Sequence, residues 1–147
     1  MIAAAILSAC TAPSPQPAAA PASDPVSEEW YGRAVADLKA INQEAAKQLD
    51  AGKTDSAAAL VTKAQDLQKR LITPQHPSLA AMEAAADLDD LYGRILMANH
   101  NLGWARIVFQ KNVARWTNWR PITPETERRQ KLARKRIQEC DRQLEAR

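Results

Sequence analysis

The chain has 147 residues, of which 46% are hydrophobic and 25% charged, with 9 Pro, 4 Gly, 2 Cys and a formal net charge of +3. This length allows one domain with a real core, but not a (β/α)₈ barrel or a Rossmann domain with a second domain. Helix formers dominate and β-branched residues are few, which argues against an all-β fold. No apolar run reaches the roughly 18 residues needed to span a bilayer, and two Cys cannot build a disulfide scaffold or a Cys₄ zinc site.

The first twenty-five residues differ in composition from the rest. Residues 1–9 (MIAAAILSA) are apolar and Ala-rich, and they end at Cys10. Residues 11–25 hold five prolines and no large apolar side chain. Such a segment cannot bury enough apolar surface to offset the entropy lost on ordering. We therefore expect a disordered tether that follows the end of a secretory signal.

Leu7-Ser8-Ala9-Cys10 resembles the lipobox of bacterial lipoproteins, in which an aliphatic residue and two small residues precede an acylated Cys. The resemblance implies that residues 1–9 are a signal peptide, that Cys10 is the lipid attachment site, and that residues 10–25 form a lipidated tether. It favours the outer membrane of the bacterial envelope, facing the periplasm, because Thr11 stands where Asp is the inner-membrane retention signal. No Lys or Arg precedes the apolar stretch, which leaves open a start upstream of Met1. A disordered tail with a chance Cys is the alternative.

From residue 26 on, apolar residues recur at spacings of three and four, which predicts five amphipathic helices with short connections. The expected boundaries are Asp24-Pro25 to Gly52, a second helix capped by Thr54, a third capped by Ser78, a fourth from about Leu102 to Trp119, and a fifth that starts at Thr123-Pro124-Glu125. The expected core-facing residues are Tyr31, Ala34, Leu38, Ile41, Ala45 and Leu49; Ala57, Leu60, Val61, Ala64, Leu67 and Leu71; Met82, Ala85, Leu88, Leu91, Tyr92 and Ile95; Trp104, Ile107, Val108, Phe109, Val113 and Trp116; and Ala133, Ile137, Cys140 and Leu144. The sequence therefore predicts an all-α domain of antiparallel hairpins over residues 26–147.

The spacing of small and apolar residues within two hairpins resembles the tetratricopeptide repeat. The positions that carry the resemblance are Gly52, Ala57, Val61 and Ala64 in one hairpin and Gly93, Ala105 and Phe109 in the next. It implies stacked hairpins with a groove lined by their first helices, which would hold a protein or peptide partner. Val61 stands where an aromatic residue is usual and Asn112 where a small one is, and the units lie 48 rather than 34 residues apart. An irregular helical bundle is the alternative.

We find no catalytic or metal-binding pattern in the sequence. His76 and His100 have no Asp or Glu at i±3 and no His at i+4. Glu83, Asp87 and Asp90 share one helix face, which we interpret as a solvated acidic face. The glycines are scattered and no serine lies in a nucleophile elbow. We expect no enzyme, no cofactor and no metal ion.

The charge is distributed unevenly along the chain. Residues 1–100 carry 8 Lys/Arg and 12 Asp/Glu, whereas residues 101–147 carry 12 and 5. Three interpretations are open for the basic end: a nucleic-acid surface, an anionic lipid or polymer surface, or basic side chains that pair with the acidic first half while Trp rings fill the core. We favour the last. The candidate basic binding face consists of Arg106, Lys111, Arg115, Arg128, Arg129, Lys131 and Lys135.

Together these features predict a membrane-anchored, non-enzymatic binding or scaffolding module for a protein or peptide partner in the cell envelope. Binding of nucleic acid or an anionic polymer through residues 104–136 is the alternative function. A lipid anchor would place the domain outside the cytoplasm, which makes nucleic acid a poor partner. The oligomeric state does not follow from the sequence.

Overall fold

The computed structural model describes residues 24–146, which form five α-helices, one 3₁₀ turn and no strand. The elements are η1 (Pro25–Ser27), α1 (Glu29–Asp50), α2 (Thr54–Ile72), α3 (Leu79–Ala98), α4 (Leu102–Asn118) and α5 (Pro124–Glu145). The predicted all-α fold is confirmed. None of the helices in this range is long and apolar enough to cross a membrane. The predicted signal peptide, Cys10 and nearly all of the predicted tether lie outside the described residues.

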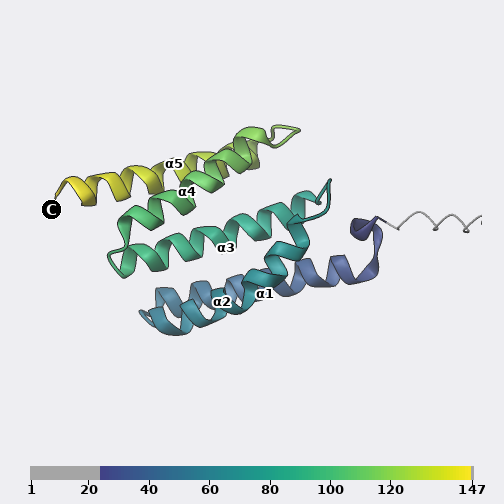
Figure 1. The fold of residues 1–147 in the computed structure, drawn as a ribbon, viewed down its shortest axis with the longest axis horizontal. Helices are drawn as coiled ribbons and strands as arrows, with labels where there is room; N and C mark the ends of the chain where they lie inside the picture. The colour runs from purple at the N-terminus through teal and green to yellow at the C-terminus, as the bar shows by residue number, and fades with distance from the viewer. Residues whose placement is uncertain (1–23, 147) are drawn as a thin grey trace, which may run out of the picture.

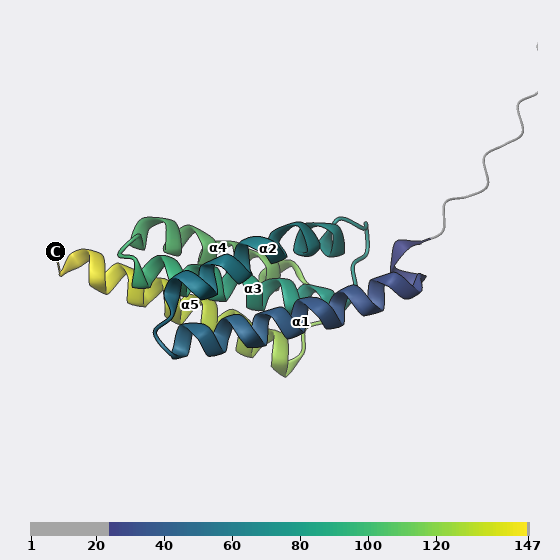
Figure 2. The ribbon, with the colours of Figure 1, turned by 90° about the horizontal axis from the view of Figure 1, so that it is seen from below.

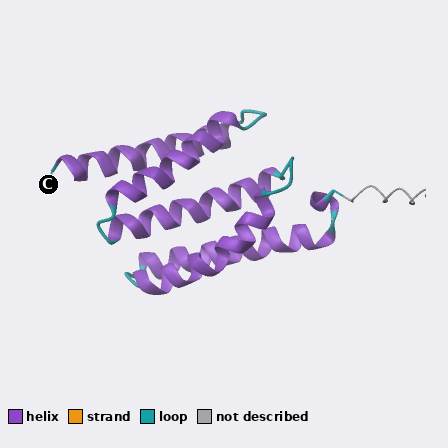
Figure 3. Cartoon of the chain, viewed as in Figure 1, coloured by secondary structure: helices purple, strands orange, loops and turns teal. Residues whose placement is uncertain are grey.

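The helices follow one another as antiparallel neighbours in a stack (Figures 1 and 3). α1 pairs with α2 and α3 with α4, while α5 packs along α4. α3 also packs against α1 and α2, so it lies between the first hairpin and α4. Figure 2 shows the stack from below, with α1 and α2 in front. Residues of α1, α3 and α5 line one groove, so these three helices share one side of the molecule.

The two hairpins turn in the same way. Gly52, with φ +74°, ends α1, and the Lys53 N–H donates to the Gln48 carbonyl at 2.9 Å. Forty-eight residues later His100 has φ 59°, and the Asn101 N–H donates to the carbonyl five residues before it at 2.8 Å. Both turns thus use the left-handed residue and six-to-one hydrogen bond of a Schellman motif. The hairpins correspond at this 48-residue offset.

Two of the five expected helix starts are confirmed by side-chain caps. The Ser78 hydroxyl accepts from the Ala81 N–H, and Thr123 forms a reciprocal capping box with Thr126. The expectation that Thr54 caps α2 is wrong, because Thr54 is the first residue of that helix and Lys53 before it makes no side-chain cap. Asp24 caps the short η1 turn instead of α1.

The core has two parts. The larger part joins α1, α2 and α3 around the fully buried side chains of Leu38, Leu71 and Leu88. The smaller part joins α4 and α5 through Ala105, Phe109 and Cys140. The prediction that Cys140 is buried is confirmed. α5 is therefore part of the packed domain rather than a separate extension.

Four apolar side chains that we expected in the core are exposed: Tyr92, Trp104, Ile107 and Leu144. Trp104 and Ile107 are 67% and 53% exposed, so the expectation that Trp rings fill the core holds for Trp116 but not for Trp104. The buried face of α4 is the row of positions at steps of three and four that begins at Leu102, and Trp104 and Ile107 lie off that row. The buried residues of α4 are Leu102, Ala105, Phe109, Asn112 and Trp116.

Candidate functional site

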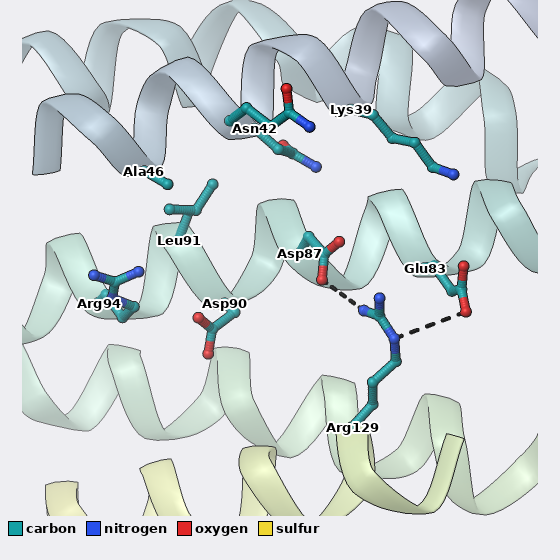
Figure 4. A pocket seen from close by; sticks show the side chains of 10 residues that line it. Lys39, Asn42, Ala46, Glu83, Asp87, Asp90, Leu91, Arg94 and Arg129 are labelled. Atoms are coloured by element: carbon teal, nitrogen blue, oxygen red, sulfur yellow. Dashed lines mark hydrogen bonds and ion pairs between the residues drawn. The ribbon is translucent and has the colours of Figure 1, made fainter. Parts of the chain in front are cut away.

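A groove of about 360 Å³ runs between α1, α3 and α5 (Figure 4). α3 forms its floor, and α1 and α5 form its two sides. Its lining is polar and charged for the most part. The lining residues are Lys39, Asn42, Gln43 and Ala46 from α1, Glu83, Asp87, Asp90, Leu91 and Arg94 from α3, and Arg129 from α5.

Arg129 crosses the groove and ties α5 to α3. Its guanidinium donates to Asp87 at 2.6 Å and to Glu125 at 2.8 Å, and it lies 3.9 Å from Glu83 (Figure 4). The same guanidinium lies over the Trp116 ring, 5.8 Å from its centroid. Glu83 and Asp87 thus remain partly exposed, and α5 brings a cation against this acidic face.

Asp90 lies deeper along the same face of α3. The Arg136 guanidinium donates to its carboxylate at 3.3 Å. Desolvation by burial nevertheless raises the pKa of Asp90 above its ordinary value of 3.8, against the opposing effects of Arg136 and Arg94. Arg94 itself donates to Asp50 of α1 at 2.7 Å. Each carboxylate that lines the groove therefore has a guanidinium partner, and Asp90 is partly desolvated among them.

Asn42 is the groove residue whose hydrogen bonding is incomplete. Its side chain is inside the fold, with the residue only 6% exposed, and its amide nitrogen donates to the Ala84 carbonyl at 2.8 Å. Its amide oxygen, Oδ1, has no hydrogen-bond partner. A buried polar atom without a partner costs free energy, so Asn42 marks a destabilised point in the wall of the groove. The sequence analysis missed Asn42, although its place between Ile41 and Ala45 on the inward face was a visible signal.

A second polar cluster lies on the other side of α3 and was also missed. The Asp89 carboxylate accepts hydrogen bonds from Gln68 of α2 at 3.0 Å, from Arg115 of α4 at 2.8 Å, and from Lys111 at 3.2 Å. The Asp89 and Arg115 side chains are 8% and 5% exposed. Asp89 therefore links the first hairpin to the second through charged and neutral hydrogen bonds, and this cluster is structural.

The candidate basic face is distributed over several parts of the fold. Five of its seven residues form ion pairs: Arg106 with Asp141, Lys111 and Arg115 with Asp89, Arg128 with Glu125, and Arg129 with Asp87. The expected pairing of the basic end with the acidic first half is confirmed by Arg115 and Arg129. Lys131 and Lys135 are exposed on α5.

The groove presents carboxylates paired with guanidinium groups beside Lys39 and Gln43, an arrangement suited to holding a polar chain. Within residues 24–146, no three His, Cys, Asp or Glu side chains lie together so that they could hold a metal ion. Comparison of the chain with protein-family models, with curated proteins and with solved structures finds no match.

Proposed function

We propose that this protein is a non-enzymatic binding module that holds a segment of a partner protein in the groove between α1, α3 and α5. The observation that carries the proposal is the groove of about 360 Å³, whose lining is mostly polar and charged. Its carboxylates accept hydrogen bonds and its cations donate them, so the groove can hold the backbone and the polar side chains of an extended segment.

The arrangement of the hairpins supports this function. The groove is lined by the first helices of successive hairpins, as the tetratricopeptide-repeat resemblance implies. Gly93, Ala105 and Phe109, three positions of that resemblance, lie together where α3 meets α4. A rigid groove loses little conformational entropy when it binds a chain, which favours recognition of an extended segment.

We further propose that the module is held on the outer membrane through acylated Cys10, with residues 10–25 as its tether. The support is the four-residue pattern Leu7-Ser8-Ala9-Cys10 and the Pro-rich segment that follows it. At about 3.1 Å per residue, residues 11–25 would span roughly 45 Å when extended. A domain on such a tether can reach partners in the envelope without touching the lipid surface.

Affinity capture with a matched pair of variants tests the groove. Full-length protein from the native host is incubated with envelope extract, and retained proteins are identified by mass spectrometry. Asn42→Leu fills the groove wall and removes the acceptor, whereas Thr62→Leu makes a similar change on the exposed side of α2. We expect a partner retained by the wild type and by Thr62→Leu, with at least tenfold less on Asn42→Leu. Equal retention by all three proteins, with both variants folded by circular dichroism, would contradict the proposal.

A further inference from the structure

The outer face of α4 carries apolar side chains that the fold does not use. Trp104 and Ile107 are exposed, and Ile107, Gln110 and Ala114 lie at i, i+3 and i+7 on one side of the helix. We call Trp104, Ile107, Gln110 and Ala114 the outer α4 face. An exposed Trp next to an exposed Ile is unusual enough on a small domain to need a reason.

A trough of about 450 Å³ continues this face toward α5. It is separate from the groove between α1, α3 and α5, with which it shares no residue. The residues that line it are Gln110, Val113, Ala114, Arg134, Ile137 and Gln138. The trough therefore presents an apolar floor between the antiparallel helices α4 and α5. A row of side chains from a partner could enter it.

The first hairpin shows that a hairpin of this kind does not need an apolar outer face. At the 48-residue offset, Trp104 corresponds to Ser56 and Ile107 to Ala59. Gln110 and Ala114 correspond to Thr62 and Asp66. The same face of α2 is therefore small and polar, although the two hairpins turn alike and bury their corresponding Ala57 and Ala105 positions fully. The apolar residues on α4 are specific to that helix.

Cations lie beside the trough without acidic partners. Lys131, Arg134 and Lys135 are exposed on α5 and make no ion pair with any residue that the structure describes. The residues that line the trough include no Asp or Glu. The surface thus combines an apolar strip with a positive flank, and its complement is an apolar ridge with a negative flank.

We propose that the outer α4 face and its trough dock an acidic amphipathic helix of a partner protein. The strip from residue 104 to residue 114 is about 15 Å long at 1.5 Å per residue, which matches about three helical turns. A second copy of this chain is a poor occupant, because the same face would bring its own cations and no carboxylates. A bilayer is also a poor occupant, because two exposed apolar side chains bury less surface than one myristoyl chain, which alone binds only marginally.

Peptide binding to the full-length protein tests the docking surface. The probe is a fluorescent 12-residue helical peptide with Leu at i, i+3 and i+7 flanked by Glu, and its twin has Lys in place of each Glu. We expect the Glu peptide to bind at least tenfold more tightly than the Lys peptide, as measured by anisotropy. The double variant W104S/I107A, which installs the α2 residues, and the variant K131E/R134E should each weaken Glu-peptide binding at least tenfold.

The variants change exposed side chains, so we expect their melting temperatures to stay close to that of the wild type. The proposal is overturned if the Glu peptide does not bind, or if W104S/I107A binds it as well as the wild type does. It is also overturned if W104S/I107A abolishes binding to vesicles of phosphatidylglycerol and phosphatidylethanolamine, or dissociates a dimer in sedimentation, while peptide binding is unchanged. The Asn42→Leu variant should bind the peptide normally, because the groove is a different site.

Discussion

Gly93 and Phe109 set the distance between α3 and α4. A Cβ atom added at Gly93 would lie 2.5 Å from Cε1 and Cζ of the fully buried Phe109 ring, so one of the helices would have to shift. Nothing lies within 4 Å of a Cβ added at Gly32, an exposed residue of α1. A side chain is therefore excluded at Gly93 but has room at Gly32, although both glycines are in helices.

We predict that Gly93→Ala destabilises the protein and Gly32→Ala does not. Overpacking costs about 1–3 kcal/mol, which outweighs the gain in helix propensity of up to about 1 kcal/mol that Ala has over Gly. Gly32→Ala has the gain in helix propensity without overpacking, so it should not destabilise the protein. Urea denaturation of both variants gives the free energies of unfolding. A Gly93→Ala variant as stable as Gly32→Ala would show that the close approach of α3 and α4 is not required.

Asp89 is the residue whose removal should cost most among the polar groups. Asp89→Ala leaves the Arg115 guanidinium, 5% exposed, without its carboxylate, and such broken buried pairs cost about 3–5 kcal/mol. Asp87→Ala should cost less, because the Asp87 side chain is 48% exposed and Arg129 keeps Glu125. The double variant Asp89→Ala/Arg115→Leu should recover part of the loss. Equal unfolding free energies for the two Ala variants would show that the Asp89 junction is not buried as described.

The charged groups at the start of α5 stabilise its first turns, because Glu125 pairs with Arg128 and Arg129 of the same helix. The pKa of Glu125 is lowered from 4.5 to about 2, first by the hydrogen bond from Arg128 and also by Arg129. A carboxylate with a lowered pKa stabilises the fold above its unfolded pKa, and the contribution disappears as the pH falls from about 4.5 toward 2. The Thr123–Thr126 capping box begins the same turn, so Glu125 acts at the point where α5 is fixed.

We predict that Glu125→Gln lowers the melting temperature at pH 7 and that the difference from wild type shrinks to nearly zero at pH 2. Glu127→Gln is the control, because Glu127 lies in the same first turn and interacts with the helix dipole without pairing to Arg128 or Arg129. Thermal melts from pH 2 to pH 7 make the comparison. A difference that stays constant over this range, or that Glu127→Gln reproduces, would contradict the pairing.

The helices themselves could be predicted because their signals are local. Gly52, Ser78 and Thr123 mark ends through backbone conformation or capping, and the structure places them as expected. The buried face of α4 could not be predicted from side-chain size, since Trp104 is exposed while the polar Asn112 is buried and donates to the Ala86 carbonyl at 2.9 Å. That face depends on which helix packs against α4 and how closely.

The site was less predictable than the fold. The sequence placed Glu83, Asp87 and Asp90 on one helix face, but only the stack shows that α1 and α5 enclose this face as a groove. The spacing of the first helix places Asn42 on its inward face, but the missing hydrogen bond of its amide oxygen follows only from the packed structure. Local patterns thus located the helices, while the groove depends on contacts between residues more than forty positions apart.

At the scale of the whole molecule, we propose a membrane attachment at Cys10, followed by a domain with a binding groove. We predict that Cys10→Ser, expressed in the native host from its own start codon, leaves the membrane fraction and loses labelling by a clickable fatty acid. The reason is that none of the described helices offers a membrane span, so acylation would supply the attachment. Ser14→Thr, outside the four-residue motif, serves as a control for expression. Wild-type protein that carries no fatty acid and fractionates with the cytosol would show that the anchor is wrong.

Site-specific photo-cross-linking in the native host tests the central claim, that the groove holds a partner, most directly. Benzoylphenylalanine is placed at Gln43, which lines the groove, or at Thr62 on the exposed side of α2, in otherwise wild-type full-length protein. We predict that irradiation gives a discrete adduct from position 43 that is absent from position 62, and that Asn42→Leu removes it. Adducts of equal yield from both positions, or from position 62 alone, would contradict the account.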